Sequence, residues 1–463
     1  MPRAFRLALA LAILPAPIFA QQDHRTLERE ILKELVEINT SDSAGHTDLA
    51  AQAMARRLTA AGFPSGDMQI MELDPGHWTL VARYRGDGTG VKPILMIAHM
   101  DVVGARREDW SVDPFTFLEK DGWYYGRGSN DDKAGVATLV ATLIRLKQEG
   151  YRPGRDLIIA LTGDEETTSN SISALVTKHR DLVDAEYALN ADAGGGQLVD
   201  GKPLSFEVQT AEKVYLSFQL EVRNKGGHSS LPERDNAIYH LANGLTRLER
   251  FSFPVRLNAT TRAFLQAAAG TAPVTEAADM RLVARTGNLP AARRLSSSPY
   301  YNSILRTTCV ATRLFAGHAD NALPQLARAT VNCRMLPDDP PDSVQAVLTR
   351  VLADTAIHLS RLDEPVASPA SPLRPDIMTA VQDIVARMWP GAAVVPEMST
   401  GATDGLYVRN AGIPTYGVSA VFDPVDDVRI HGRDERIGVK AFHDAVDFWY
   451  ELVKRLGSQK PGT

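Results

Sequence analysis

The sequence has few cysteines: Cys309 and Cys333 are the only two among 463 residues. Two cysteines cannot form the disulfide scaffold of a small secreted domain, so a chain of this length needs a hydrophobic core. Neither cysteine has the spacing of a zinc-binding motif. Both lie in strand-like segments that could be neighbours, which fits either a disulfide bond in an oxidising compartment or two buried thiols.

The sequence also lacks an excess of positive charge. It contains 50 Lys and Arg residues against 56 Asp and Glu residues, for a formal net charge of -6, and no basic cluster stands out. This composition argues against nucleic acid and anionic membrane surfaces as partners. Internal repeats and low-complexity segments are missing as well, and a hydrophobic content of 44% is ordinary for a globular protein.

Long apolar runs are missing except at the N-terminus. There, Arg3 and Arg6 precede an apolar run from residue 7 to residue 19, and the small residue Ala20 follows it. This pattern predicts a signal peptide over residues 1–20 and a secreted or periplasmic mature protein without membrane contact. A retained N-terminal anchor is the alternative.

The first part of the mature chain alternates between apolar strands and helices. Short apolar runs occupy residues 93–98, 156–161 and 185–190, and a helix is expected over residues 134–149. Strands that are apolar throughout and separated by helices are typical of a mostly parallel sheet with both faces buried. We therefore expect an α/β domain.

The pattern changes after about residue 211. The order strand, helix, two strands and helix is expected over residues 214–222, 236–250, 307–315, 327–334 and 343–356. This order indicates a small α+β unit with an open, ferredoxin-like sheet. Residues 251–301 contain helical fragments that we interpret as an insertion in this unit.

The last segment returns to the α/β pattern after a linker rich in proline and serine. We therefore expect a catalytic domain made of residues 21–211 and 367–463, interrupted by an inserted domain over residues 212–366.

Acidic and histidine residues follow the predicted buried strands. His99 and Asp101 come after the first strand, Glu165 and Glu166 after the second, and Asp192 after the third. The carboxyl ends of parallel strands meet at one edge of a sheet, which is where ligands bind in such folds. These side chains are therefore expected to lie close together.

Two further residues extend this set. Asp131 lies in a glycine-rich loop before the expected helix, and His431 lies in a loop near the C-terminus. Each acidic group alone is also explained by helix capping or by the helix dipole. A convergent cluster of carboxylates is different, because the charges repel unless cations neutralise them. The sequence therefore predicts a metal centre.

Five motifs of the sequence resemble those of the M20 metallopeptidase family, which includes aminoacylases, succinyl-diaminopimelate desuccinylase and glutamate carboxypeptidases. They are Ala98-His-Met-Asp101, Gly126-Arg-Gly-Ser-Asn-Asp-Asp-Lys133, Gly163-Asp-Glu-Glu166, Gly226-Gly-His-Ser-Ser230 and His431-Gly432. Residues 307–334 are most similar to the branch of carboxypeptidase S and the N-acyl-amino-acid hydrolases.

The resemblance implies a zinc-peptidase-like catalytic domain with two zinc ions, in place of which cobalt or manganese is also possible. It implies that His99, Asp131 and Asp192 hold one ion. Asp131, Glu166 and His431 would hold the other, so that Asp131 bridges both. It further implies a cis peptide bond between Asp131 and Asp132.

The resemblance also implies roles for residues that do not bind metal. Asp101 would accept a hydrogen bond from the imidazole of His99, and Glu165 would be the general base. From the inserted domain, His228 would donate to the developing oxyanion with help from Asn321, and Arg334 would bind a substrate carboxylate.

Thr403 belongs to a loop, residues 401–404, that lines the substrate pocket in the family. The inserted domain would act as a lid and as the surface through which relatives commonly form homodimers. Whether His228 acts within its own chain or across a dimer is left open by the sequence.

The expected function is therefore dinuclear zinc hydrolysis of N-acyl amino acids or short peptides that have a free C-terminal carboxylate. A dipeptidase of the same family is one alternative. A non-catalytic binding protein on the same fold is another, but it would have lost metal ligands or the base, and Glu165 and the ligand set are all present. A structural metal site is disfavoured because structural zinc prefers thiolate or imidazole shells.

Overall fold

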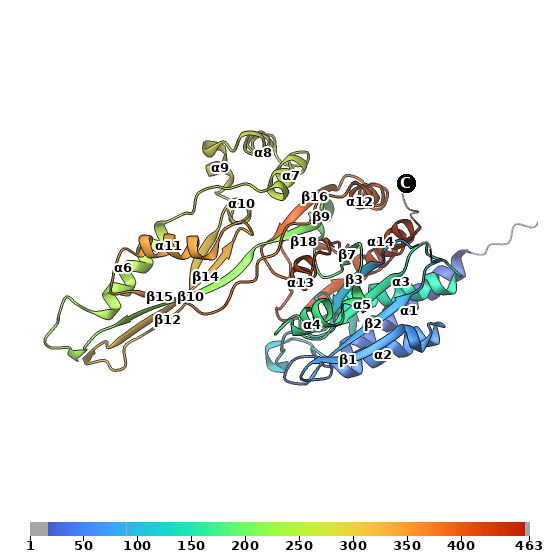
Figure 1. Ribbon diagram of the computed structural model, residues 1–463, viewed down its shortest axis with the longest axis horizontal. Coiled ribbons are helices and arrows are strands. Elements are labelled where there is room, and N and C mark those ends of the chain that lie inside the picture. The colour runs from blue at the N-terminus through green and yellow to red at the C-terminus, as the bar shows by residue number, and fades with distance from the viewer. Residues whose placement is uncertain (1–16, 89, 459–463) are drawn as a thin grey trace, which may run out of the picture.

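The computed structural model describes residues 17–88 and 90–458 (Figure 1). The predicted signal peptide lies outside the described residues except for its last four, where helix α1 (Pro17–Glu37) begins. Within the described part of the chain, no helix combines the length and apolarity that a membrane span requires.

The larger part of the molecule is built on a ten-stranded sheet in the order β1-β2-β6-β3-β7-β17-β9-β8-β18, with β16 paired to β9. Strands β6, β3, β7 and β17 run parallel to one another, and the pairs β1–β2, β2–β6, β17–β9 and β8–β9 are antiparallel. The strands are β1 (Met68–Asp74), β2 (His77–Tyr84), β3 (Ile94–His99), β6 (Leu157–Thr162), β7 (Tyr187–Asn190), β8 (Gly195–Val199), β9 (Lys202–Glu212), β16 (Ala393–Ser399), β17 (Thr415–Gly417) and β18 (Phe422–Pro424).

Helices cover both faces of this sheet, as the apolar strands predicted. On β3, Met96 faces one core and Ile97 faces the other. The first core is covered by α1, α2 (Thr47–Ala60), α3 (Lys133–Gln148), α12 (Pro375–Met388) and α14 (Val439–Gly457). The second is covered by α4 (Asn170–Lys178), α5 (Arg180–Val183) and α13 (Gly405–Asn410). Smaller elements are η1 (Ser65–Asp67), η2 (Arg107–Asp109), β4 (Leu118–Lys120), β5 (Trp123–Tyr125) and β19 (Arg436–Gly438).

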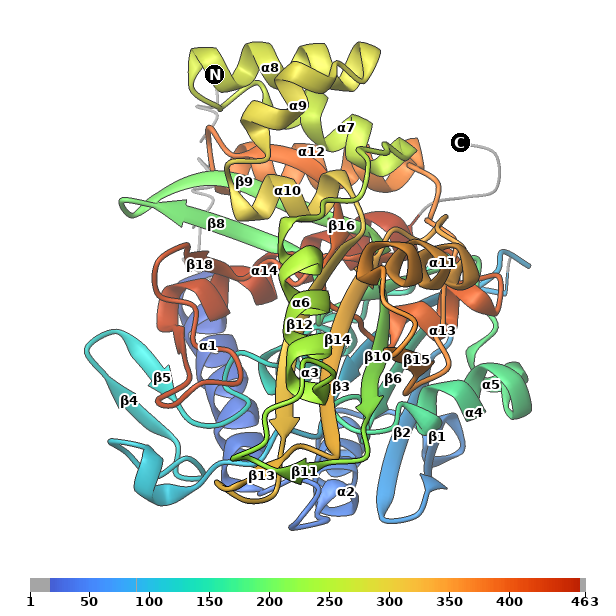
Figure 2. The ribbon, with the colours of Figure 1, turned by 90° about the vertical axis from the view of Figure 1, so that its left-hand side faces the viewer.

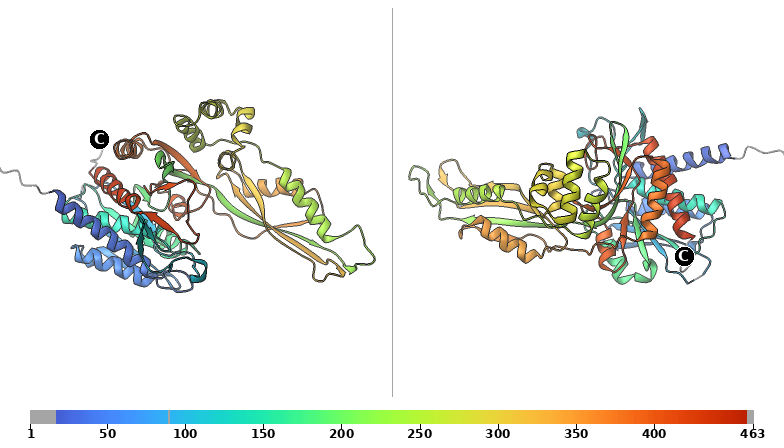
Figure 3. Two further views of the ribbon diagram at one scale, coloured as in Figure 1. Left: turned by 180° about the vertical axis from the view of Figure 1, so that it is seen from behind. Right: turned by 90° about the horizontal axis from the view of Figure 1, so that it is seen from above.

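A second unit protrudes from this domain (Figures 1 and 3). Its antiparallel sheet has the order β12-β14-β10-β15, formed by β12 (Thr308–Ala316), β14 (Leu326–Met335), β10 (Val214–Arg223) and β15 (His358–Arg361). Helices α6 (Ala237–Arg250) and α11 (Pro341–Leu352) pack on it, and β11 (Gly227–His228) pairs with β13 (Ala322–Leu323) in a short ribbon. Strand β15 was missed because the sequence His-Leu-Ser-Arg has no apolar alternation.

Cys309 and Cys333 form a disulfide bond between β12 and β14. The two residues lie directly opposite each other in the antiparallel register, with their Cα atoms 4.1 Å apart. Of the two alternatives that the sequence left open, the structure has the disulfide.

The segment 251–301 corrects one expectation. It forms α7 (Ala259–Ala268), α8 (Val274–Thr286), α9 (Leu289–Leu295) and, extending slightly further, α10 (Pro299–Leu305). These helices do not join the ferredoxin-like sheet; they share a core with Val395 and Met398 of β16, the neighbour of β9 (Figure 2). This packing buries Val395 and Met398 of β16, which are 1% and 3% exposed.

Candidate metal centre and active site

Three neighbouring parallel strands bring the predicted ligands to one edge of the sheet. His99 is the last residue of β3, Glu165 and Glu166 follow β6, and Asp192 follows β7. Because β3 pairs in parallel with both β6 and β7, their carboxyl ends are adjacent. Asp131 reaches the same edge from the loop before α3.

His99, Asp131, Glu165, Glu166, Asp192 and His431 are called the metal cluster below. Its first half surrounds the imidazole of His99. Its Nε2 atom lies 3.1 Å from Oδ1 of Asp131 and 3.6 Å from Oδ1 of Asp192. His99 is 1% exposed, so these groups meet away from bulk water.

The second half surrounds His431. Its Nε2 atom lies 3.0 Å from Oδ2 of Asp131 and 2.9 Å from Oε1 of Glu166. The two carboxylate oxygens of Asp131 therefore face two different imidazoles. This is the arrangement that a carboxylate bridging two metal ions requires.

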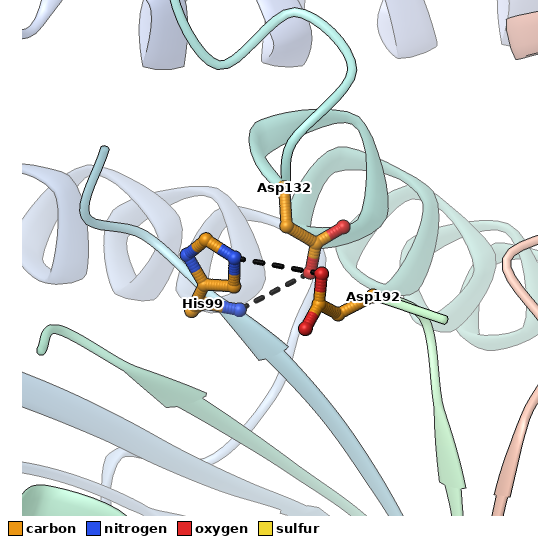
Figure 4. A group of neighbouring side chains, drawn as sticks. All are labelled: His99, Asp132 and Asp192. Atoms are coloured by element: carbon orange, nitrogen blue, oxygen red, sulfur yellow. Dashed lines mark hydrogen bonds and ion pairs between the residues drawn. The ribbon is translucent and has the colours of Figure 1, made fainter. Parts of the chain in front are cut away.

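Asp132 lies beside the cluster and has another contact. Its Oδ2 atom accepts a hydrogen bond of 3.2 Å from the backbone N–H of His99, as Figure 4 shows together with Asp192. The peptide bond between Asp131 and Asp132 is cis, as the family resemblance implied. Asp132 could also offer an oxygen to an ion held by His99 and Asp192. Because Asp132 accepts a hydrogen bond from the backbone of His99, we infer that it positions His99.

Asp101 connects the first strand end to the second. Its carboxylate accepts hydrogen bonds from the backbone N–H groups of Glu165 at 3.2 Å and Glu166 at 3.0 Å. The Nδ1 atom of His99 lies 3.1 Å from the backbone oxygen of Asp101 and 3.5 Å from its carboxylate. The nearer acceptor for His99 is thus the backbone carbonyl, and the carboxylate mainly holds the Glu165–Glu166 turn.

Glu165 points into the same cluster without being among the nearest partners of either histidine. Its carboxylate lies 4.0 Å from Nε2 of His99. Burial raises the pKa of Glu165 well above its usual value, and the charges of Asp192 and Asp404 raise it further. A carboxylate with a raised pKa is suited to accept and return a proton near neutral pH.

The charges of the cluster fit bound cations. Burial raises the pKa of Asp192 to about 7. Hydrogen bonds to Asp131 and Glu166 raise the pKa of His431 to about 10. In the metal-free chain, bound protons therefore offset part of the negative charge of this cluster, and divalent cations would take over that role. A set of imidazole and carboxylate donors suits zinc, cobalt and manganese.

Glu435 is a functional residue that the sequence did not reveal. Its fully buried carboxylate accepts hydrogen bonds from the backbone N–H groups of Gly128 at 3.1 Å, Asn130 at 3.0 Å and Asp131 at 3.1 Å. It also pairs with Arg127 at 2.5 Å. Glu435 therefore fixes the loop that carries Asp131. Its only sequence signal is its position four residues after His431.

Thr403 lines the cavity above the cluster, but its hydroxyl group is engaged with the protein. It donates to Oε1 of Glu212 at 2.7 Å and accepts from Nδ2 of Asn190 at 3.1 Å. Asp404 next to it accepts a hydrogen bond of 2.5 Å from Thr162. The loop is thus fixed to strands β6, β7 and β9.

The cluster opens into a cavity of about 1130 Å³ between the catalytic and inserted domains. Arg334, on β14, lines this cavity and lies over the ring of Tyr215 at 4.7 Å. Burial lowers the pKa of Arg334, and no described carboxylate forms an ion pair with it. A partly buried guanidinium without a counter-ion is suited to bind a substrate carboxylate.

His228 and Asn321 do not line this cavity. They lie on the ribbon β11–β13 of the inserted domain, where the backbone oxygen of Asn321 accepts a hydrogen bond of 3.1 Å from Ser229. His228 is exposed, and its Nδ1 atom lies 2.7 Å from the hydroxyl of Ser230. Within one chain, the structure therefore separates both residues from the metal cluster.

Comparison with known proteins shows what this chain is similar to. Residues 95–455 match the model of peptidase family M20/M25/M40. Human N-fatty-acyl-amino acid synthase/hydrolase PM20D1 is 31% identical over 392 residues, covering 81% of this chain and 76% of the human protein. Probable carboxypeptidase S-like 2 of Dictyostelium discoideum is 28% identical, with 82% and 74% of the two chains covered. Aminoacylase-1 of Mus musculus is 25% identical, with 84% and 86% covered.

Solved structures share the whole architecture. An M20 family metallo-carboxypeptidase from Sulfolobus solfataricus superposes with a TM-score of 0.68 at 18% identity, over 93% of this chain and 99% of that protein. Human carnosine dipeptidase 1 superposes with a TM-score of 0.65 at 17% identity, over 95% and 98%. At these identities the similarity shows the fold, a catalytic domain with an inserted domain.

Proposed function

Because this chain belongs to peptidase family M20/M25/M40 and is a metal-dependent amidohydrolase, we propose that it is a dinuclear zinc enzyme. Its substrates would be N-acyl amino acids or short peptides with a free C-terminal carboxylate. The observation that carries this proposal is the position of Asp131, whose two oxygens face His99 and His431 with Glu165 beside them.

These contacts support two ligand sets. His99, Asp131 and Asp192 would hold one ion, and Asp131, Glu166 and His431 the other. Zinc bound there would polarise the scissile carbonyl and make a water molecule more acidic, and cobalt or manganese would supply the same chemistry.

The protein groups around the ions would move the protons. Glu165 takes a proton from the attacking water and returns it to the leaving amine, so that the amide splits into a carboxylate and an amine. Asp101 holds the backbone of Glu165 and Glu166 and thereby fixes the direction of both carboxylates. Oriented carboxylates of this kind lower the barrier because no reorganisation is needed during the reaction.

Arg334 would select the substrate. Its guanidinium lies in the cavity without a carboxylate partner from the described chain, and its planar donors match a carboxylate in two parallel hydrogen bonds. The relatives described above include an N-fatty-acyl-amino acid synthase/hydrolase, an aminoacylase and a probable carboxypeptidase S-like protein, and the names of all three refer to amides of amino acids.

A homodimer would allow His228 to take part in catalysis. Strand β12 is the edge of the inserted sheet and exposes Val310 at 60%, Leu314 at 68% and Phe315 at 61%. An apolar sheet edge of this kind favours pairing with another chain. In such a dimer, His228 of a second copy would reach the metal centre and donate to the oxyanion, with Asn321 beside it.

The N-terminus and the cysteines support a secreted or periplasmic location. A signal peptide over residues 1–20 would direct the chain out of the cytoplasm, to the periplasm or beyond. The disulfide bond between Cys309 and Cys333 is of a kind that persists in such oxidising compartments.

The proposal is tested with the purified mature chain and a panel of N-acyl amino acids and dipeptides, each with a free or an amidated C-terminus. We expect zinc-dependent hydrolysis of the free-carboxylate substrates, with two metal ions per chain by elemental analysis. Glu165→Gln should keep both ions and lose about 10²–10⁴ in kcat.

Two other outcomes would replace the proposal. Cleavage restricted to dipeptides, with N-acyl amino acids untouched, would identify a dipeptidase. Two bound ions without hydrolysis of any amide would indicate a binding protein on the same fold.

A further inference from the structure

The cavity extends beyond the metal cluster to two carboxylates that have no role in the proposed reaction. They belong to Glu207 of β9 and Glu397 of β16, and both line the cavity. Strands β9 and β16 pair in parallel, with Glu397 next to Gln209 in the register. Glu207 lies two residues before Gln209, so that its side chain points to the same face of the sheet. The two carboxylates therefore lie on one wall.

The two carboxyl groups of this wall have no basic partner among the described residues. Glu207 accepts a hydrogen bond of 2.8 Å from Nε2 of Gln197, and no basic side chain in the described ranges forms an ion pair with it. The carboxylate of Glu397 has neither a hydrogen bond nor an ion pair with any residue that the structure describes. Burial raises the pKa of both groups, that of Glu397 to about 7, and each also lies near another carboxylate.

Two buried side-chain oxygens behind this wall also accept no hydrogen bond from the described residues. Gln209 is 0% exposed and Glu212 is 2% exposed. Among the described atoms, nothing donates a hydrogen bond to Oε1 of Gln209 or to Oε2 of Glu212, although the other oxygen of Glu212 lies 2.7 Å from Arg409. Buried acceptors normally have a partner, because leaving one unpaired costs free energy. Oε1 of Gln209 and Oε2 of Glu212 are therefore acceptors without a donor among the described atoms.

The spacing of these groups argues for an organic cation instead of another metal ion. A metal ion needs several ligand atoms close together. All groups of three or more potential ligands within 4.8 Å, in the part of the chain that is described, come from the cluster around His99 and His431. Glu207, Glu212 and Glu397 form no such group. An ammonium or guanidinium group donates three to five hydrogen bonds from a larger volume and suits more widely spaced oxygens.

We propose that Glu207 and Glu397, with Gln209 beside them, form an acidic subsite that binds a positively charged group of the substrate, either an ammonium or a guanidinium. This inference rests on the proposed function and makes its substrate class more specific. The substrate carries a carboxylate that binds Arg334 and, at a distance from the scissile amide, a cationic group. A neutral acyl chain would leave the acidic wall without a partner.

The test uses two matched pairs of substrates with the zinc-loaded full-length mature chain. One pair is Nα-acetyl-lysine and Nα-acetyl-norleucine, and the other is 6-aminohexanoyl-leucine and heptanoyl-leucine. The pairs place an ammonium or a methyl group on either side of the scissile amide. At about pH 8, above the pKa of about 7 of Glu397, the carboxylate of Glu397 is available to bind a cation. We expect kcat/KM to be about tenfold or more higher for the cationic member of at least one pair, as charge-assisted hydrogen bonds allow.

Variants connect this preference to the subsite. Glu397→Gln and, separately, Glu207→Gln should reduce the ratio between the cationic and the neutral substrate toward one. Each ratio is measured within one protein preparation, so that a partial loss of folded enzyme cancels. Glu249→Gln, at an exposed position on α6, is the matched control and should retain the wild-type ratio.

The outcomes separate the two proposals. Equal hydrolysis of cationic and neutral members, or a preference that survives in both variants, would overturn the acidic subsite and leave the amidohydrolase proposal intact. If neither pair is hydrolysed, the proposed function fails. In that case the acidic subsite is tested by itself, by calorimetric titration of the protein with 6-aminohexanoate and, separately, with hexanoate. Tighter binding of 6-aminohexanoate supports the subsite, and equal binding of the two compounds overturns it.

Discussion

The carboxylate of Glu435 accepts a hydrogen bond of 3.1 Å from the backbone N–H of Asp131, although 304 residues separate the two in the chain. The same carboxylate neutralises Arg127, which is 2% exposed. Asp131, the proposed bridging ligand, is therefore held by a charge from the last segment of the catalytic domain, the segment that also supplies His431.

Replacing Glu435 by Gln should weaken both folding and metal binding. The substitution leaves Arg127 buried without a counter-charge, which typically costs about 3–5 kcal/mol in the free energy of unfolding. Metal affinity should fall about 10–100-fold, because Asp131 loses its support. Denaturant unfolding and chelator competition measure these effects. Glu119→Gln, which removes the partner of Arg29 in an exposed pair of 2.9 Å, should cost at most about 1 kcal/mol.

Metal binding should release protons at neutral pH. The pKa of His431 is raised to about 10 by its hydrogen bonds to Asp131 and Glu166, so that its imidazole is protonated at pH 7 in the metal-free chain. A bound ion requires the neutral imidazole. Affinity should therefore fall as the pH is lowered, and calorimetry in two buffers of different ionisation enthalpy should show net proton release. Binding enthalpies that do not depend on the buffer would contradict a protonated His431 in the metal-free chain.

Arg334→Lys should discriminate between free and amidated substrates. A lysine keeps the positive charge but loses the paired planar donors, so we expect kcat/KM for free-carboxylate substrates to fall about 10–100-fold. The rate for amidated substrates should change little. Steady-state kinetics on matched pairs provides the measurement, and an equal loss on both substrates would assign Arg334 a structural role.

Reduction of the disulfide should destabilise the inserted domain. Cys309 and Cys333 are 24 residues apart in the chain, and closing a loop of this length contributes about 3 kcal/mol in the chain-entropy model. Denaturant unfolding should therefore shift to lower denaturant concentration when a reductant is added. The double variant Cys309→Ala/Cys333→Ala should match the reduced protein and not respond to the reductant.

Leu314→Arg should prevent dimer formation if β12 is the interface. It places a charge on the exposed edge strand, where pairing with a second copy would bury it. Light scattering should then show a monomer, and kcat should fall because His228 of a second copy is missing. Val274→Arg, at a position that is 87% exposed on α8, is the control. A wild-type chain that is monomeric and fully active would refute the dimer.

The sequence by itself determined the local elements and the chemistry of the site. Apolar runs such as residues 94–99 and 157–162 are buried on both faces, and this requirement alone indicates a parallel sheet. The position of His99 and Asp192 directly after such strands then places them at one edge. These inferences succeed because burial and strand direction depend on short stretches of chain.

Only the tertiary structure decided the contacts between distant segments. The sequence does not show that Glu435 supports Asp131, that helices α7 to α10 cover β16, or that Glu207 and Glu397 share a wall of the cavity. It also could not place His228 on a ribbon away from the metal cluster of its own chain. Each of these relationships depends on which surfaces pack together, and packing selects partners by shape and burial instead of by distance along the chain.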